Sequence, residues 1–166
     1  MITTIGYEKS HLSDFIRTLE VSEVGILVDI RDRAQSRVRG FSKSALSEAV
    51  EAAGMKYYHF KALGDPKEGR DAARSGNFEL FRKIFSEVME SDEDKNALSI
   101  VKELAVNNKI CLMCYERDQR HCHRKIVASH LEEMLDVKAQ HLGVQKFASK
   151  RSTERRVLYP DQSAAA

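Results

Sequence analysis

Short runs of apolar residues recur along the chain, and each run is closed by small or polar residues. The longer runs cover Ile2 to Ile5, Val24 to Ile30, Met55 to Phe60 and Lys109 to Cys114, and a weaker run covers Val137 to Leu142. Val24 to Ile30 is almost continuously apolar, which is typical of a parallel strand buried on both faces. The pattern therefore predicts four to five strands.

Apolar residues at helical spacing fill the stretches between these runs. The first two helices follow Ser10 and Ser42, each a plausible N-cap, and further helices are predicted over 78–89, 97–105 and 123–135. Because strands alternate with helices, we expect a parallel sheet with right-handed crossover connections.

Two segments do not follow this alternation. Lys61 to Gly76 contains Gly64, Pro66 and Gly69 and many charges, so we predict a long loop that is either a lid or disordered. Residues 145–166 are predicted to form a basic C-terminal extension that is partly disordered. Residues 1–144 are expected to form a single α/β domain, with a mainly parallel sheet of four to five strands flanked by helices in a Rossmann-like three-layer arrangement.

Composition narrows the protein class without naming a function. The chain has 166 residues, a net charge of +2 and three cysteines. With an odd cysteine count and no apolar leader, we expect a cytoplasmic protein with reduced thiols and no disulfide framework. No apolar run approaches the roughly 18 residues needed to span a bilayer, so no membrane association is expected.

The charge is distributed unevenly, and one segment is strongly basic. Arg31 to Lys43 reads RDRAQSRVRGFSK, with five basic side chains against Asp32. Arginine forks suit phosphate, and Phe41 could stack on a base, so the segment indicates a nucleotide or nucleic acid as partner, with DNA favoured. The alternative is an ordinary solvated surface.

Polar residues gather where the predicted strands end, which is where ligands bind in open α/β sheets. Asp29 and Glu116 are the best candidates for catalysis, because two carboxylates can divide acid and base duties or stabilise the sugar cation of a breaking glycosidic bond. Tyr7 could stack on a base or donate a hydrogen bond. The alternative for both carboxylates is a salt bridge to Arg31, Arg37 or Arg124.

The stretch KICLMCYERDQRHCHR, Lys109 to Arg124, combines a strand with a helix start. Backbone N–H groups at Cys122 to Arg124 could form a phosphate seat, although Arg124 could instead hold the loop by pairing with Glu116 or Asp29. Cys122 could be a nucleophile, since a helix N-terminus and neighbouring histidines lower a thiol pKa.

The remaining cysteines allow several interpretations. A metal site would need Cys111, Cys114 and Cys122 with His121 or His123, but strand residues three apart point to opposite faces. We therefore expect no metal and no cofactor, with Cys111 in the core and Cys114 lining the pocket. A thiol- or metal-dependent site at Cys114 and Cys122 remains an alternative.

Four segments together resemble a known family. ITTIGYEKS, VDIRDRAQSRVRGFSKSAL, KALGD and ICLMCYERDQRHCHR match the order and spacing of motifs in the domain of unknown function (DUF) family 488, from Ile2 to about His141. Ala34 replaces the family proline and Asp65 replaces the second glycine of the family's L-G-G turn. The matching positions that the resemblance implies as functional are Gly6, Tyr7, Asp29, Arg31, Ser36, Arg37, Phe41, Lys43, Leu63, Gly64, Cys111, Cys114, Glu116, Cys122, His123 and Arg124.

The sequence thus favours an enzyme that acts on a nucleotide or nucleic acid, most concretely by cleaving an N-glycosidic bond. Glu116, Asp29 and Tyr7 are the predicted catalytic residues. A sensor or adaptor that binds the same ligands without turnover is the first alternative. The predicted substrate-binding residues are Gly6, Arg31, Ser36, Arg37, Phe41, Lys43, Gly64, Cys114, Cys122, His123 and Arg124.

Overall fold

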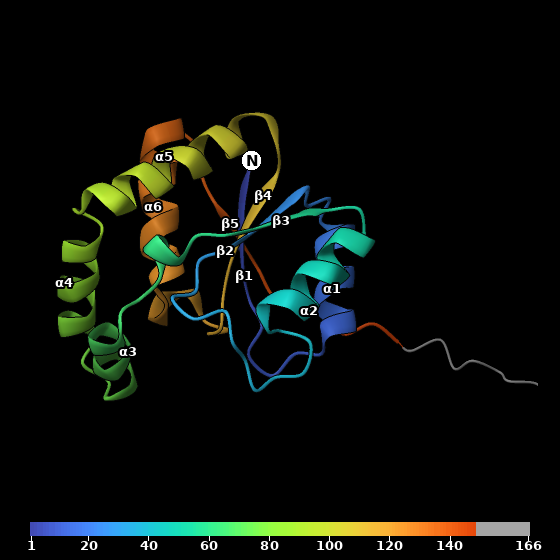
Figure 1. The fold of residues 1–166 in the computed structure, drawn as a ribbon, viewed down its shortest axis with the longest axis horizontal. Helices are drawn as coiled ribbons and strands as arrows, with labels where there is room; N and C mark the ends of the chain where they lie inside the picture. Colours follow the sequence, from blue (N-terminus) through green and yellow to red (C-terminus); the bar gives the residue numbers. More distant parts are fainter. Residues whose placement is uncertain (149–166) are drawn as a thin grey trace, which may run out of the picture.

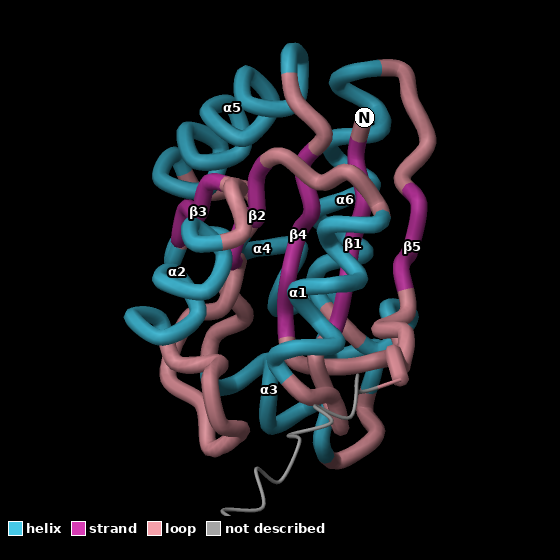
Figure 2. The backbone as a smooth tube through the Cα atoms, turned by 90° about the vertical axis from the view of Figure 1, so that its right-hand side faces the viewer, coloured by secondary structure: helices cyan, strands magenta, loops and turns pink. Residues whose placement is uncertain are grey.

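The computed structural model describes residues 1–148, and within them five strands form one parallel sheet. The strands are β1 (Ile2–Gly6), β2 (Ile26–Asp29), β3 (Lys56–His59), β4 (Ile110–Cys114) and β5 (Gln140–Leu142). They are ordered β3-β2-β4-β1-β5, as Figure 2 shows. Every neighbouring pair is parallel. All carboxyl ends therefore meet at one edge of the sheet, as predicted.

Helices cover both faces of this sheet. α1 (Leu12–Val21) and α2 (Lys43–Ala52) lie on one face, and α4 (Phe78–Val88), α5 (Asp92–Asn107) and α6 (His123–Leu135) lie on the other (Figure 1). The expected single α/β domain with three layers is confirmed. The helical layer of α1 and α2 packs against the sheet around four buried residues, Phe15, Leu19, Leu27 and Met113.

Alternation along β4 shows how the strands divide the core. Ile110 and Leu112 pack with α4 to α6, whereas Cys111 and Met113 pack with α1 and α2. Cys111 is fully buried there, as the sequence predicted. Cys114, three residues further on, belongs to the opposite face and stands at the strand tip.

The prediction of one long loop over Lys61 to Gly76 was wrong. A 3-10 turn, Lys61–Leu63, is followed by the helix α3 (Lys67–Arg74), whose N-cap is Pro66. The sequence KEGRDAAR offers little apolar stripe, so helical spacing could not identify it. α3 lies at the carboxyl end of the sheet, where it borders the site described below (Figure 2).

The ends of α1 and α2 agree only in part with the capping residues predicted from the sequence. Ser42 is the N-cap of α2 as predicted, but His11 rather than Ser10 precedes α1. Gly54 has a φ of 83°, the left-handed conformation expected after the second helix.

The start of the predicted C-terminal extension is part of the described structure. Its backbone lies along α1, where Gln145 donates to Thr18 Oγ1 (3.0 Å) and Phe147 donates to Asp14 Oδ1 (3.1 Å). The expectation of a basic, partly disordered tail otherwise concerns residues 149–166, which lie outside the described residues. Within residues 1–148, none of the helices combines the length and apolar character that crossing a membrane requires.

Candidate functional site

A cavity of about 970 Å³ opens at the carboxyl ends of β1, β2 and β4, beside α3. It is bordered by the segment after β2, by the basic side chains of α3 and by the tip of β4. This is the place that open parallel sheets commonly offer to ligands. The cavity is lined by Tyr7, Arg31, Asp32, Arg33, Gln35, Ser36, Arg37, Val38, Asp65, Lys67, Arg70, Asp71, Arg74, Cys114, Tyr115, Glu116 and His123.

Two glycines allow the strand-end segments to approach one another closely. A Cβ on Gly6 would collide with the carbonyl group of Glu116, and a Cβ on Gly64 would collide with the backbone of Asp32. Both glycines shape the cavity from behind, since neither borders it. Gly6 and Gly64 were predicted to bind the substrate, and what the structure shows is that they let Glu116 and Asp32 approach the strand ends closely.

Asp29 does not reach the cavity. Its carboxylate is fully buried and accepts hydrogen bonds from Arg31 Nε (2.9 Å), Arg31 Nη2 (2.6 Å), the Arg31 backbone (3.1 Å) and Tyr57 Oη (2.6 Å). The two carboxylates expected to share the site, Asp29 and Glu116, are therefore not brought together. The alternative of a salt bridge between Asp29 and Arg31 is what the structure contains.

The ion pair fixes Arg31 beneath the cavity. Burial alone would lower the pKa of Arg31, but the hydrogen bonds and negative charge of Asp29 raise it above its ordinary value. Arg31 Nη1 also donates to Tyr7 Oη (3.0 Å) and to the Phe41 carbonyl (2.8 Å). A permanent positive charge is thus held against the hydroxyl of Tyr7.

Tyr7 borders the cavity, but its ring is already stacked. Its ring centroid lies 4.3 Å from that of Phe41, with nearly parallel planes, and its hydroxyl donates to Ser36 Oγ (3.1 Å). Phe41 is fully buried and does not line the cavity, so the expectation that it stacks on a ligand base was wrong. Tyr115, which packs edge-on against Tyr7 and is 44% exposed, is the aromatic ring that a ligand can reach.

Four carboxyl groups line the cavity, and two of them, Asp65 and Glu116, form no salt bridge within residues 1–148. Burial raises the pKa of Asp65 to about 7; the positive charge of Arg70 opposes this shift, and the negative charges of Glu116 and Asp32 add to it. Asp65 Oδ1 is buried and has no hydrogen-bond partner among the described residues. Burial also raises the pKa of Glu116. Asp65 is therefore close to half protonated at neutral pH, so it can serve as a proton donor.

Arg124 holds the loop that carries Glu116. Its guanidinium, fully buried, donates to the Glu116 carbonyl, to the Arg117 carbonyl (3.0 Å), to Thr4 Oγ1 (3.3 Å) and towards Cys114 Sγ (3.2 Å). Burial lowers the pKa of Arg124 to about 10, so it stays charged at neutral pH. Because Arg124 does not line the cavity, the structure does not offer it to a phosphate as expected. It holds the loop through backbone carbonyls rather than through the alternative ion pair.

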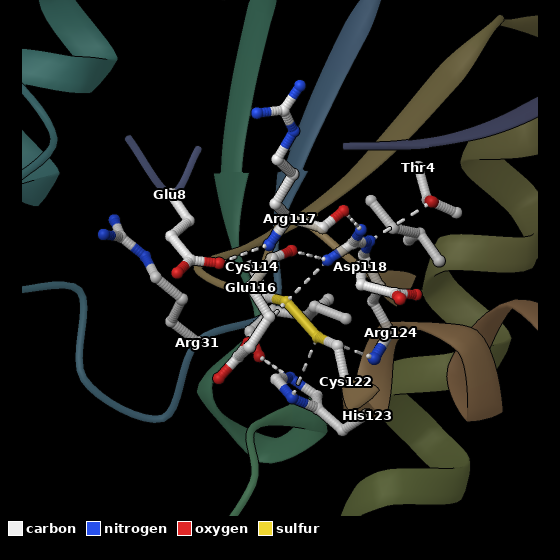
Figure 3. Close-up of a disulfide and its surroundings, with 12 residues drawn as sticks. Thr4, Glu8, Arg31, Cys114, Glu116, Arg117, Asp118, Cys122, His123 and Arg124 are labelled. Carbon is white, nitrogen blue, oxygen red and sulfur yellow. Dashed lines mark hydrogen bonds between the residues drawn. A yellow bond between two sulfur atoms is a disulfide. The ribbon is translucent and has the colours of Figure 1, made fainter. Parts of the chain in front are cut away.

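The first turn of α6 does not offer its N-terminus to a ligand in the cavity either. Cys122 is its N-cap, and the Cys122 sulfur accepts from the backbone N–H of Arg124 (3.5 Å). Cys122 is paired with Cys114 in a disulfide, which corrects the expectation of reduced thiols throughout (Figure 3). Cys114 lines the cavity as predicted, whereas Cys122 lies behind it, so a phosphate seat at this helix start is not open.

Around the mouth of the cavity the basic side chains are numerous. Arg70 pairs with Asp32 (3.0 Å), and Lys67 pairs with Asp71 (2.9 Å). Arg33 and Arg37 are exposed and form no salt bridge within residues 1–148. Lys43 does not line this cavity. It lines a neighbouring hollow of about 530 Å³, and Arg33 borders both.

Comparison with known families gives one result. The family described as "Domain of unknown function DUF488" matches residues 11–131, which is most of the chain. The chain belongs to this family. Comparisons with curated proteins and with solved structures found no match. The resemblance inferred from the sequence motifs is therefore confirmed, and the DUF488 region contains every cavity residue except Tyr7.

Several cavity residues of this DUF488 protein were not predicted from its sequence. Asp65 was noted only as a departure from the family turn, and Tyr115 was not considered as a ligand contact. The basic residues of α3 were assigned to a loop. The available signal was the high density of charged residues in 67–74. A helix in this segment, placed at the edge of the sheet, lines the cavity with those charged side chains.

Proposed function

We propose that this protein is an enzyme that acts on a nucleotide or nucleic acid and cleaves an N-glycosidic bond. The observation that carries the proposal is the combination, in one cavity, of six basic side chains with two carboxyl groups of raised pKa, Asp65 and Glu116. Cations at the rim suit the phosphates of the ligand, and perturbed acids within suit proton transfer.

The basic side chains are arranged to favour a phosphate-bearing ligand. Arg37 and Arg33 are exposed and without a carboxylate partner in the described chain, so a phosphate would meet them without first breaking an ion pair. Arg74 contacts Asp71 only at 3.9 Å and is similarly available. Guanidinium groups bind phosphate oxygens in a bidentate manner, which gives both affinity and orientation.

The two carboxyl groups can divide the chemistry. Asp65, with a pKa of about 7, can donate a proton to the departing base, and the carboxylate of Glu116 can stabilise the sugar cation or activate water. This assignment replaces the Asp29–Glu116 pair, because Asp29 is saturated by Arg31 and Tyr57.

Aromatic contacts to the base come from the wall of the cavity. Tyr115 is exposed enough to stack on a base, and Tyr7 supplies a hydroxyl polarised by Arg31. If the substrate is duplex DNA, its base has to leave the stack to enter the cavity, as other enzymes that modify bases require. Single-stranded substrates avoid this cost.

The test is incubation of the protein with labelled single- and double-stranded DNA that contains ordinary and modified bases, followed by hot alkali to cut abasic sites. Release of free base from nucleosides and nucleotides is followed in parallel by chromatography. We expect strand cleavage or base release by the wild type and a loss of at least a hundredfold in Glu116→Gln and Asp65→Asn.

Glu103→Gln is the matched control, because Glu103 is an exposed glutamate on α5, away from the cavity. It should leave the rate unchanged. Binding of DNA or nucleotide without release of base from any substrate would contradict the enzymatic proposal and favour a sensor or adaptor that uses the same cavity.

A further inference from the structure

Three side chains beside the cavity form a cluster that the proposed chemistry leaves unused. The sulfurs of Cys114 and Cys122 and a ring nitrogen of His123 all lie within 4.8 Å of one another, and all three residues are buried. Sulfur and imidazole nitrogen in such a group are the ligands of thiophilic divalent cations. Figure 3 shows the cluster with Glu116 on one side of it and Arg124 on the other.

The orientation of His123 favours a role as a ligand. Its Nε2 lies 2.8 Å from the carbonyl oxygen of Ile30, an acceptor, so Nε2 carries the proton. The lone pair is then on Nδ1, which lies 3.8 Å from Cys122 Sγ. Histidine ligands of metals commonly donate their second ring N–H to a carbonyl in this way, because it fixes the ring.

The surroundings of the sulfurs suit two thiolates. Arg124 Nη1 lies 3.2 Å from Cys114 Sγ, and the backbone N–H of Arg124 points to Cys122 Sγ at 3.5 Å. The Cα atoms of the two cysteines are 7.6 Å apart, wider than is usual for a disulfide. A cation bound to both sulfurs through bonds of about 2.3 Å bridges such a separation more readily.

We infer that the reduced form of this protein binds one zinc-like divalent cation through Cys114, Cys122 and His123. Three protein ligands leave one position for a molecule from the cavity, which is the ligand count of catalytic zinc sites. Cys114 and His123 line the cavity, and Glu116 Oε2 lies 3.2 Å from Cys114 Sγ. The cation would thus be bound at the wall of the site, and its binding does not depend on the glycosidic chemistry proposed above.

These three ligands differ from the metal ligands considered from the sequence, which also included Cys111 and offered His121 as an alternative to His123. Cys111 is excluded because it points into the core under α1 and α2, so the spacing of Cys111 and Cys114 does not define the site. His121 is excluded as well, because its ring nitrogens do not belong to the group of ligand atoms within 4.8 Å of one another, and its ring stacks on Phe78 instead. These three ligands come together because the connection between β4 and α6 places Cys122 and His123 next to Cys114 at the tip of β4.

Metal binding and the disulfide are mutually exclusive. A dithiol reductant transfers two electrons and two protons to the disulfide: the S–S bond breaks, Cys114 and Cys122 become thiols, and the reductant becomes a disulfide. Binding of the cation then releases the two thiol protons. Oxidation by a disulfide donor reverses both steps and expels the cation.

The experiment uses the full-length protein, reduced with a phosphine under anaerobic conditions, freed of reductant and titrated with Zn²⁺ by calorimetry and with Co²⁺ by absorption. We expect one ion per chain and sulfur-to-cobalt charge-transfer absorption. Cys111→Ala, which removes the third cysteine, should behave like the wild type, whereas Cys122→Ala and His123→Gln should weaken binding at least a hundredfold.

A second measurement needs no variant, so it holds even where a substitution prevents folding. Alkylation of the reduced wild type is followed by mass spectrometry with and without Zn²⁺. We expect Cys114, which lines the cavity, to be modified without zinc and protected with it. Absence of stoichiometric binding by the reduced wild type, or equal alkylation of Cys114 with and without zinc, would overturn the inference.

Discussion

At the scale of single residues, folding raises the pKa of Asp65 into the neutral range. Its pKa of about 7 in the folded protein lies above that of an exposed aspartate, chiefly because of burial. A carboxyl with a raised pKa retains its proton in the folded state while the unfolded chain has lost it. The free energy of unfolding therefore falls as pH rises from about 4 to 7.

Asp65→Asn removes this cost. We expect the variant and the wild type to be about equally stable near pH 4, and the variant to become more stable by about 2 kcal/mol above pH 7, because relaxation around the buried carboxylate lowers the full effect of the pKa shift. Denaturant unfolding across this pH range measures the difference. A difference that stays constant with pH would show that Asp65 does not titrate as described.

At the scale of elements, the site depends on how closely the tip of β1 packs against the loop after β4. Gly6→Ala would place a methyl group against the carbonyl of Glu116, so the loop must move. We expect a loss of about 2 kcal/mol in the free energy of unfolding, the usual order for overpacking. Weaker ligand binding should accompany it, because Glu116 shifts with the loop.

Gly143→Ala is the matched control, since a Cβ at Gly143 meets nothing within 4 Å. Its unfolding midpoint should stay within experimental error of the wild type or rise slightly. Equal effects of the two substitutions would contradict the close approach of β1 to the Glu116 loop.

Arg124 acts on the same loop from the other side. It is a fully buried cation whose hydrogen bonds go to two backbone carbonyls, a threonine hydroxyl and a sulfur. Several donors in one planar fork can hold a turn that no regular hydrogen-bonding ladder supports. The segment from Cys122 to Arg124 thus has a structural task in addition to any chemical one.

At the scale of the whole molecule, the sheet could be predicted from the sequence because buried parallel strands leave continuous apolar runs, as Val24 to Ile30 does. The meeting of the strand tips at one edge followed from the parallel order. α3 could not be predicted, because a charged helix at the edge of a sheet carries no apolar stripe.

The pairing of side chains at the site was harder to predict than its location. Asp29 was assigned to catalysis because it ends a strand, but alternation points it to the α1–α2 face, where Arg31 and Tyr57 reach it. Asp65 acquires its character from burial beneath α3, which spacing along the chain does not reveal. The contact of Cys114 with Cys122 likewise depends on the path of the connection between two cysteines that are eight positions apart in the sequence.

The most direct measurement of the central claim, that the cavity at the strand tips receives a phosphate-bearing ligand, is binding of a labelled single-stranded oligonucleotide at several salt concentrations. Fluorescence anisotropy would compare the wild type with Arg37→Gln, at the cavity, and Arg17→Gln, on α1 and also exposed to solvent. We predict that Arg37→Gln weakens binding about tenfold and lowers the slope of log affinity against log salt by about 0.7, the value for one phosphate contact, while Arg17→Gln changes neither. Equal binding by both variants, or no binding by the wild type, would contradict the account.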